Sequence, residues 1–298
     1  MYPPDDRYVV YQLFGFLTIY WYAAMILGGA ILAAWFGTRR VVLRGYNPDH
    51  AWNILALGLV TGIGTARAWY VFNEWSRFAT ARASYDSTWR WLLFEVANPQ
   101  TGGLAIQGGI LGALVGCVLY TLWNKLDTLE WVDLAAPCFS IGQAIGRWGN
   151  FFNREAYGLP MASAQPWGLR IPQEFRVLQY QDVGAYPVEA TRFHPTFLYE
   201  SLWNVLVLIS LLVIERRGRG WLRKGDLALF FGINYSIGRF FIESLRLDSL
   251  CTNGVGGTCE GALRTAQVVA LVTIAVCVAI LVLRRLWPRR ATPHVVTE

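Results

Sequence analysis

Residues 145–160 read IGRWGNFFNREAYGLP and place charged, amide and aromatic side chains close together. The polar residues are Arg147, Asn150, Asn153, Arg154 and Glu155. An arginine fork binds phosphate through two parallel donors, and amides bind hydroxyl or ester oxygens. Interleaved rings such as Trp148 and Phe151 suit contact with hydrocarbon. The stretch therefore predicts a site at which a charged head group lies beside apolar tails.

Ionisable residues also interrupt several apolar runs, where a charge is costly and by default marks a site or a pathway. These residues are Arg67, Glu200, Arg239 and Glu243. Arg239 and Glu243 are four residues apart on one helical face, so an internal ion pair explains them as well as a functional role does. Arg67 lies near a predicted helix end, where its side chain could simply extend to the membrane surface.

Two Gly-Gly pairs flank Gln107 in the segment TGGLAIQGG, residues 101–109. Small residues let membrane helices approach closely, which accounts for Gly112 and Gly116 further along the chain. The Gly-Gly pairs instead predict a broken helix end whose exposed backbone N–H groups suit an anion.

His194 precedes Pro195, and proline favours the first turn of a helix. We therefore expect His194 at a helix start near the outer face, either in the site or as a plain capping residue. Several arginines are expected to face the outer leaflet, and together they predict a phospholipid head-group site. They leave open whether the protein is an enzyme or a transporter. The arginines are Arg67, Arg147, Arg239 and Arg246.

The composition is that of a membrane protein, because 54% of the 298 residues are hydrophobic and 15% are charged, against about 25% charged in soluble domains. A helix needs about 20 apolar residues to cross a bilayer. We predict an all-α polytopic membrane protein with about seven transmembrane helices in a single domain, residues 1–298. The apolar runs are Tyr8–Thr38, Ala51–Ala66, Val96–Asn124, Leu134–Gly146, Ser201–Ile214, Leu227–Gly238 and Thr265–Leu283.

Lysine and arginine are distributed unevenly between the predicted loops. Segments 37–50, 124–131, 215–226 and 284–298 hold 13 of them in 49 residues, and the alternate segments hold 11 in 106. Because the denser set should be cytoplasmic, we expect the N-terminus outside and the basic C-terminal tail in the cytoplasm. The net charge of +6 is then a topology signal, and no nucleic-acid partner is expected.

The outer segments 72–100 and 147–194 are longer than usual connections, and such loops tend to be functional. The mixed pattern of residues 172–193 predicts a small strand-and-turn cap. Cys251 and Cys259 fall in another outer segment, where a disulfide and two free thiols are both consistent with the sequence. No cysteine or histidine spacing indicates a metal, and we expect no cofactor.

The segment GRWGNFFNREAYG, residues 146–158, resembles the motif G-R-x-G-N-F-x-N-x-E-x-x-G of the prolipoprotein diacylglyceryl transferase family. The resemblance extends along nearly the whole chain, through YWYAAMILGGAILA, GTARAWYVF, TGGLAIQGG, HPTFLYES, YSIGRFFIESLR and LRTAQVVAL. Ala23 replaces a family glycine. Many members have histidine where this chain has Gln107, so a base role at that position does not transfer.

The resemblance implies transfer of the diacylglyceryl group of phosphatidylglycerol to the lipobox cysteine of a prolipoprotein signal peptide. A thioether forms and glycerol 1-phosphate leaves. Arg147 and Arg239 are then expected at the phosphate, with Glu155 orienting Arg147 or the head group. The other expected substrate-binding residues are Asn150, Asn153, Gly158, Tyr22, Gln107, Tyr235, Arg67, Glu243 and His194.

Two alternatives remain. A lipid or solute transporter could use the same basic cavity, although the chain lacks the internal repeat typical of that class. The other alternative is a family member that binds phosphatidylglycerol without catalysing transfer, because Gln107 replaces a histidine. The expected partners are phosphatidylglycerol, prolipoproteins and membrane lipids.

Overall fold

The computed structural model describes Met1 and residues 9–13, 17–98, 103–162, 165–252, 259 and 262–286. It describes their side chains except those of residues 9–13, 17–19, 106 and 107. The chain forms two compact units. Unit 1 comprises Met1–Ala33 and Ala135–Glu298, and unit 2 comprises Ala34–Leu134.

Long helices occupy all seven apolar runs, which confirms the helical membrane class predicted from composition. They are α1 (Trp21–Leu43), α2 (Asp49–Asn73), α5 (Ile106–Trp123), α6 (Thr128–Asn153), α7 (Thr196–Arg217), α8 (Asp226–Glu243) and α9 (Thr265–Leu286). Four of them, α1, α2, α7 and α9, are each long and apolar enough to cross a membrane.

Two of the predicted runs begin as helices later than expected. The first was expected from Tyr8, but α1 begins at Trp21, after strand β1 (Val9–Leu13) pairs antiparallel with β2 (Leu17–Tyr20). Valine, isoleucine and tyrosine in these segments favour strands. The third was expected from Val96, but α5 begins at Ile106. Gly103 has a φ of +83°, so the predicted break at the glycine pair is confirmed.

Unit 2 is built on close packing of α2 against α5. A Cβ atom added at Gly108 would lie 2.5 Å from the Thr65 carbonyl oxygen, and the Thr65 hydroxyl donates to the Gly108 carbonyl at 2.7 Å. The predicted outer segment 72–100 contains helices α3 (Trp75–Ala81) and α4 (Thr88–Trp91), which continues into a π-helical turn, Leu92–Val96. The Trp91 indole donates to the Phe78 carbonyl and joins α3 to α4.

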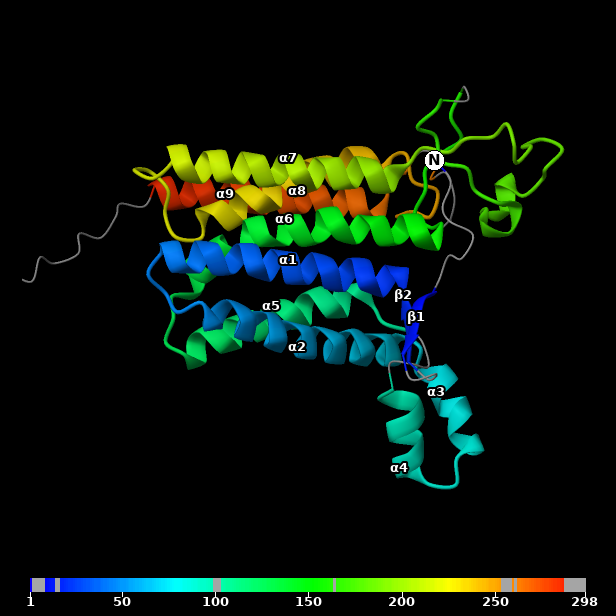
Figure 1. The fold of residues 1–298 in the computed structure, drawn as a ribbon, viewed down its shortest axis with the longest axis horizontal. Helices are drawn as coiled ribbons and strands as arrows, with labels where there is room; N and C mark the ends of the chain where they lie inside the picture. The colour runs from blue at the N-terminus through cyan, green and yellow to red at the C-terminus, as the bar shows by residue number, and fades with distance from the viewer. Residues whose placement is uncertain are drawn as a thin grey trace, which may run out of the picture. The chain divides into compact units, whose positions relative to one another are not determined.

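In unit 1, helices α6, α7, α8 and α9 lie side by side (Figure 1). The Ser201 hydroxyl on α7 donates to the Ala144 carbonyl on α6 at 2.7 Å, and the Trp203 indole donates to the Asn234 carbonyl on α8 at 2.8 Å. Gly238 on α8 leaves room for the Trp203 ring. These contacts fix the rotation of α7 relative to both neighbours.

The segment between α6 and α7 forms a small cap, but the predicted strands are absent from residues 172–193, all of which the structure describes. This part of the chain instead forms two short 3-10 turns, Gln173–Phe175 and Leu178–Tyr180. The cap is held by a buried apolar cluster and by single bridges such as Leu169 to Phe193. The cluster comprises Tyr157, Leu169, Ile171, Phe193, Phe197 and Leu247.

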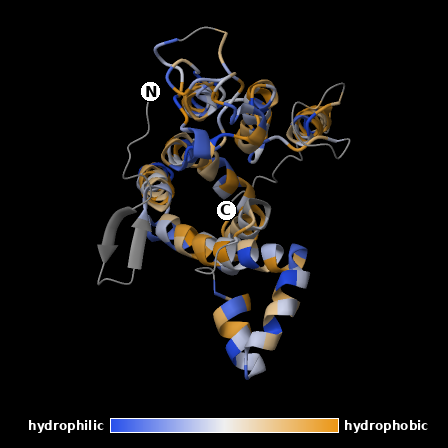
Figure 2. Ribbon diagram, turned by 90° about the vertical axis from the view of Figure 1, so that its right-hand side faces the viewer, coloured by the Kyte–Doolittle hydropathy of each residue, from blue (hydrophilic) through white to orange (hydrophobic). Residues whose placement is uncertain are grey.

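Apolar residues recur along the long helices, as the hydropathy colours of Figure 2 show, and many of their large side chains are exposed. Val272 of α9 is 57% exposed and Leu206 of α7 is 57% exposed. In water such surfaces would mark an interface, and on long apolar helices they mark contact with lipid.

Candidate functional site

The chemistry-bearing stretch identified in the sequence lies on the last turns of α6 and just beyond them. The predicted outer segment was expected to begin at residue 147, but α6 continues to Asn153. Glu155 follows the helix, and its Oε1 accepts hydrogen bonds from Asn150 Nδ2 at 2.9 Å and Asn153 Nδ2 at 3.2 Å. Its neighbours Arg154 and Ala156 have φ values of 56° and 55°, a conformation that non-glycine residues rarely adopt. This strained turn directs Glu155 back toward the two amides.

A second carboxylate, Glu200 of α7, joins two of the predicted arginines. Its Oε2 lies 2.5 Å from Arg147 Nε on α6, and its Oε1 lies 2.6 Å from Arg239 Nη1 on α8. The Glu200 side chain is 6% exposed, and the arginine side chains are 23% and 21% exposed. Buried charges are stable only when paired, so three helices meet at this carboxylate.

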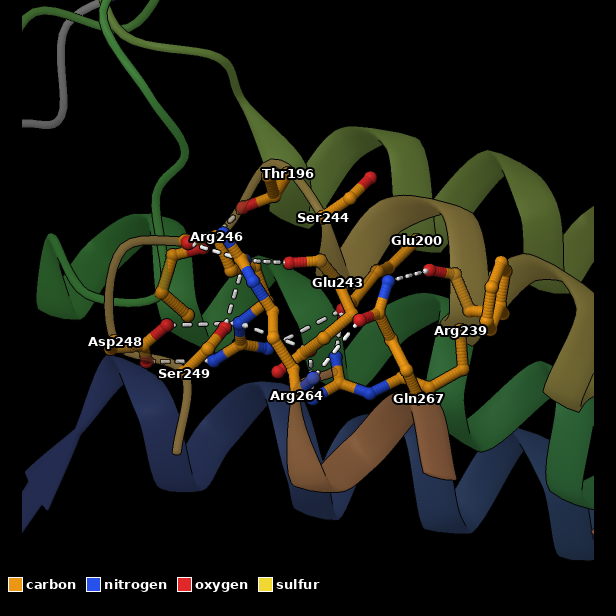
Figure 3. Close-up of polar contacts among 12 residues, drawn as sticks. Thr196, Glu200, Arg239, Glu243, Ser244, Arg246, Asp248, Ser249, Arg264 and Gln267 are labelled. Atoms are coloured by element: carbon orange, nitrogen blue, oxygen red, sulfur yellow. Dashed lines mark hydrogen bonds and ion pairs between the residues drawn. The ribbon is translucent and has the colours of Figure 1, made fainter. Parts of the chain in front are cut away.

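Glu243 extends the cluster along α8 (Figure 3). Arg239 Nη2 lies 2.7 Å from Glu243 Oε2, so the internal ion pair that the sequence offered as one explanation is present. Arg246 lies beyond the end of α8, with its guanidinium 3.4 Å from Glu200, 3.9 Å from Glu243 and 2.7 Å from Asp248. Burial of Arg246 opposes its charge and would lower its pKa. The hydrogen bond from Arg246 to Asp248, the charge of Asp248 and the charges of Glu200 and Glu243 outweigh this effect and hold the pKa of Arg246 above its ordinary value.

Arg264, at the start of α9, ties this cluster to the chain beyond α8. Its guanidinium donates to the backbone carbonyls of Glu243 and Arg246 and to the Ser249 hydroxyl, the last at 3.0 Å. Cys251 and Cys259 form a disulfide in the segment between, which resolves the alternative left open by the sequence.

A small pocket opens beside the Glu200 bridge. Tyr235, one of the predicted residues, contributes to its wall. The lining residues are Arg147, Glu200, Trp203, Asn204, Tyr235, Gly238, Arg239 and Ile242. The lining of the pocket thus combines charged groups with aromatic and apolar ones.

Gly158 and His194 lie together at the outer rim of unit 1. The Gly158 N–H donates to the His194 carbonyl at 2.9 Å, and a Cβ atom at Gly158 would lie 2.8 Å from that of His194. Only glycine fits there without displacing the neighbouring chain. The His194 ring contacts the Tyr199 hydroxyl at 3.1 Å, and burial lowers the pKa of His194 below its ordinary value.

Tyr22 of α1 packs against α6, because a Cβ atom added at Gly149 would lie 2.7 Å from its ring. Its hydroxyl is within electrostatic range of both Glu155 and Arg147. Tyr22 therefore lies close to the end of α6 that carries Arg147 and the two amides.

Two of the predicted residues, Arg67 and Gln107, belong to unit 2. Arg67 is buried, and its guanidinium donates to the carbonyls of Val96, Glu95 and Gly103 at 2.5–3.1 Å. These bonds hold the chain that leads into α5, which is a structural role. Gln107 lies in the first turn of α5, and its side chain lies outside the described residues.

The sequence-based site omitted Glu200, although it is the carboxylate shared by three arginines. Its position inside an apolar run was the available signal. Arg246 was counted among the arginines that predict a head-group site but was not named as a substrate-binding residue. Its spacing of three residues from Glu243 was the corresponding signal, since side chains three apart share a helical face.

The sequence that builds this helical fold matches one family of transferases over most of its length. The model of the family "Prolipoprotein diacylglyceryl transferase" matches residues 8–283, and the chain belongs to this family. The "Phosphatidylglycerol--prolipoprotein diacylglyceryl transferase" of Chloroflexus aggregans is 49% identical over 99% of this chain and 95% of its own length. Proteins of the same name from Gloeobacter violaceus and Geobacillus kaustophilus are 41% and 37% identical, over 89% and 95% of this chain and 88% and 93% of their own lengths.

Proposed function

We propose that this protein transfers the diacylglyceryl group of phosphatidylglycerol to the lipobox cysteine thiol of a prolipoprotein. The products are a thioether-linked lipoprotein precursor and glycerol 1-phosphate. The observation that carries the proposal is the bridge from Arg147 through Glu200 to Arg239, which fixes two guanidinium groups at one buried point. The names of the relatives support this choice of substrates.

The reaction makes one bond and breaks another. The cysteine sulfur attacks the glyceryl carbon that carries the phosphate, a C–S bond forms, and the C–O bond breaks with its electron pair remaining on the phosphate oxygen. The phosphodiester becomes a phosphate monoester with one more negative charge, which the thiol proton balances. Fixed donors aimed at that developing charge lower the barrier, and one such donor contributes about 3 kcal/mol.

Arg147 is the better placed of the two arginines to bind the phosphate directly. It contacts Glu200 through Nε, and its terminal nitrogens contact no acceptor among the described residues. Arg239 gives both terminal nitrogens to Glu200 and Glu243, so it contributes positive charge beside Arg147. The carboxylates orient both forks before the lipid arrives, which removes an ordering cost from binding.

Asn150 and Asn153 would bind the glycerol hydroxyls or ester oxygens of the lipid. Each donates through Nδ2 to Glu155, so each presents its carbonyl oxygen elsewhere. Glu155 thus acts as a positioning residue for two amides. Gly158 would let the backbone approach the substrate, and His194 and Tyr22 would line the rim.

We propose that the N-terminus and the cap lie outside the inner membrane and that the C-terminus lies in the cytoplasm. The disulfide supports this orientation, because disulfides persist in oxidising compartments. Its segment pairs with the cap where the Leu159 N–H donates to the Leu245 carbonyl. A cysteine substituted for Gly220 should resist a membrane-impermeant reagent in intact cells. Strong labelling there would reverse the orientation.

Transfer is tested with the purified protein, phosphatidylglycerol carrying a labelled glyceryl group, and a lipobox peptide. We expect label on the peptide, and none on a matched peptide with serine in place of cysteine. Complementation of a bacterial strain depleted of its own transferase should agree. Binding of phosphatidylglycerol without transfer would instead identify a binding-only member of the family.

A further inference from the structure

Asn204 is a buried amide in the pocket beside the Glu200 bridge, and the reaction scheme above leaves it without a role. It lies one helical turn beyond Glu200 on the same face of α7 and is 2% exposed. Its Nδ2 donates to the backbone carbonyl of Glu200 at 2.8 Å. Because only the amino end of the amide can face that carbonyl, Oδ1 must point the other way.

The Oδ1 atom of Asn204 has no hydrogen-bond partner among the residues that the structure describes. Buried polar atoms in proteins are nearly always satisfied, so this acceptor requires a donor that enters the pocket. Two of the neighbouring donors are already engaged, and the terminal nitrogens of Arg147 are assigned above to the phosphate. The Trp203 indole donates to Asn234, and the Arg239 fork donates to two carboxylates.

The size of the pocket limits what that donor can be. Its free space is about that of one water molecule. A phosphate group is too large for such a space, and an ester or phosphate oxygen could only accept a hydrogen bond. A water molecule or a neutral hydroxyl fits in both size and polarity, and a substrate hydroxyl would take the place of the water. In phosphatidylglycerol, the groups that donate hydrogen bonds are the two hydroxyls of the terminal glycerol.

We propose that Asn204 is a specificity-determining residue whose Oδ1 accepts a hydrogen bond from a head-group hydroxyl of the lipid. This inference rests on the proposed transferase function. The hydroxyl would enter the pocket beneath the phosphate bound by Arg147. A lipid that lacks the hydroxyl would leave the buried acceptor unpaired, and a site built in this way discriminates against such an analogue.

The test compares phosphatidylglycerol with phosphatidylpropanol, whose head group lacks both hydroxyls, as diacylglyceryl donors to a lipobox peptide. The measured quantity is the ratio of the two kcat/KM values within one preparation, which does not depend on the fraction of folded protein. We expect the wild type to favour phosphatidylglycerol, and Asn204→Leu, which keeps the shape of the side chain, to lower that ratio about tenfold. Asn204→Ala should lower it similarly and serves if the leucine variant does not fold.

Ser201→Ala is the matched control. Ser201 is buried on the same helix and makes an interhelical hydrogen bond to Ala144, away from the pocket. The ratio of the two kcat/KM values for Ser201→Ala should equal that for the wild type. If the Asn204 variants slow both lipids equally, the residue has a structural or thiol-binding role and the inference is overturned. A wild type that transfers from neither lipid would overturn the proposed function itself.

Discussion

Arg147 on α6 and Glu200 on α7 are joined through Nε and Oε2 at 2.5 Å, 53 residues apart in the chain. This contact engages the guanidinium through Nε, and in the proposed reaction its terminal nitrogens bind the phosphate. It also connects Arg147 to Arg239, because the same carboxylate binds both. The two arginines therefore act as one unit whose geometry depends on Glu200.

Replacement of Arg147 should separate the effect of charge from that of shape. Arg147→Ala should abolish transfer, and Arg147→Lys should lower kcat/KM at least 100-fold, because an ammonium cannot bind a carboxylate and a phosphate through two edges. Transfer assays on detergent-purified protein measure both. Arg217→Ala, at an exposed position at the end of α7, should retain full activity. Near-normal transfer by Arg147→Lys would show that charge alone suffices.

Glu200 and Glu243 should differ in how much each contributes to stability and to catalysis. Glu200→Gln keeps the shape of the side chain but removes the charge that binds Arg147, Arg239 and Arg246, whereas Glu243 contacts Arg239 closely and Arg246 only at 3.9 Å. We expect Glu200→Gln to lower the midpoint of thermal unfolding and kcat more than Glu243→Gln does. Breaking a buried pair by removing one partner costs about 3–5 kcal/mol. Equal effects of the two substitutions would contradict the central position of Glu200.

Substitutions at Gln107 test whether the reaction requires a dedicated base. A free thiol with a pKa near 8.5 is about 3% ionised at pH 7, and forming the thiolate costs roughly 2 kcal/mol, which nearby arginines reduce. We therefore expect the wild type to be active, Gln107→His to remain active, and Gln107→Ala to lose more activity than Gln107→His. The readout is labelled diacylglyceryl on a lipobox peptide. An inactive wild type that gains transfer as Gln107→His would make the base essential.

The disulfide should stabilise the part of the chain that anchors Arg264. Closing the eight-residue separation between Cys251 and Cys259 should contribute about 2.5 kcal/mol to the free energy of unfolding. Cys251→Ser should lower the unfolding midpoint and reduce transfer in part, because Arg264 loses its fixed position against Glu243 and Arg246. Cys277→Ser, at a free cysteine on α9, is the control and should change neither. An unchanged midpoint in Cys251→Ser would remove the disulfide from this role.

The sequence by itself determined the membrane class, the seven long helices and the residues of the α6 terminus, because hydropathy and a contiguous motif are local properties of the chain. It also predicted the pair Arg239 and Glu243, since helical geometry alone sets a spacing of four residues. Local sequence patterns predicted the structure of short segments less reliably than that of the long helices. The strands before α1 and the turns of the cap depend on packing that no window of sequence contains.

Only the tertiary structure decided which carboxylate serves which arginine. Glu200 meets Arg147, Arg239 and Arg246 because α6, α7 and α8 are rotated to face one another, and that rotation depends on interhelical contacts such as Ser201 to Ala144. The tertiary structure also decided the partners of Arg67. Its guanidinium binds backbone carbonyls, and the residue types in the sequence do not show which carbonyls lie within its reach. Ion pairs between distant segments follow from how helices pack, and packing is a property of the whole chain.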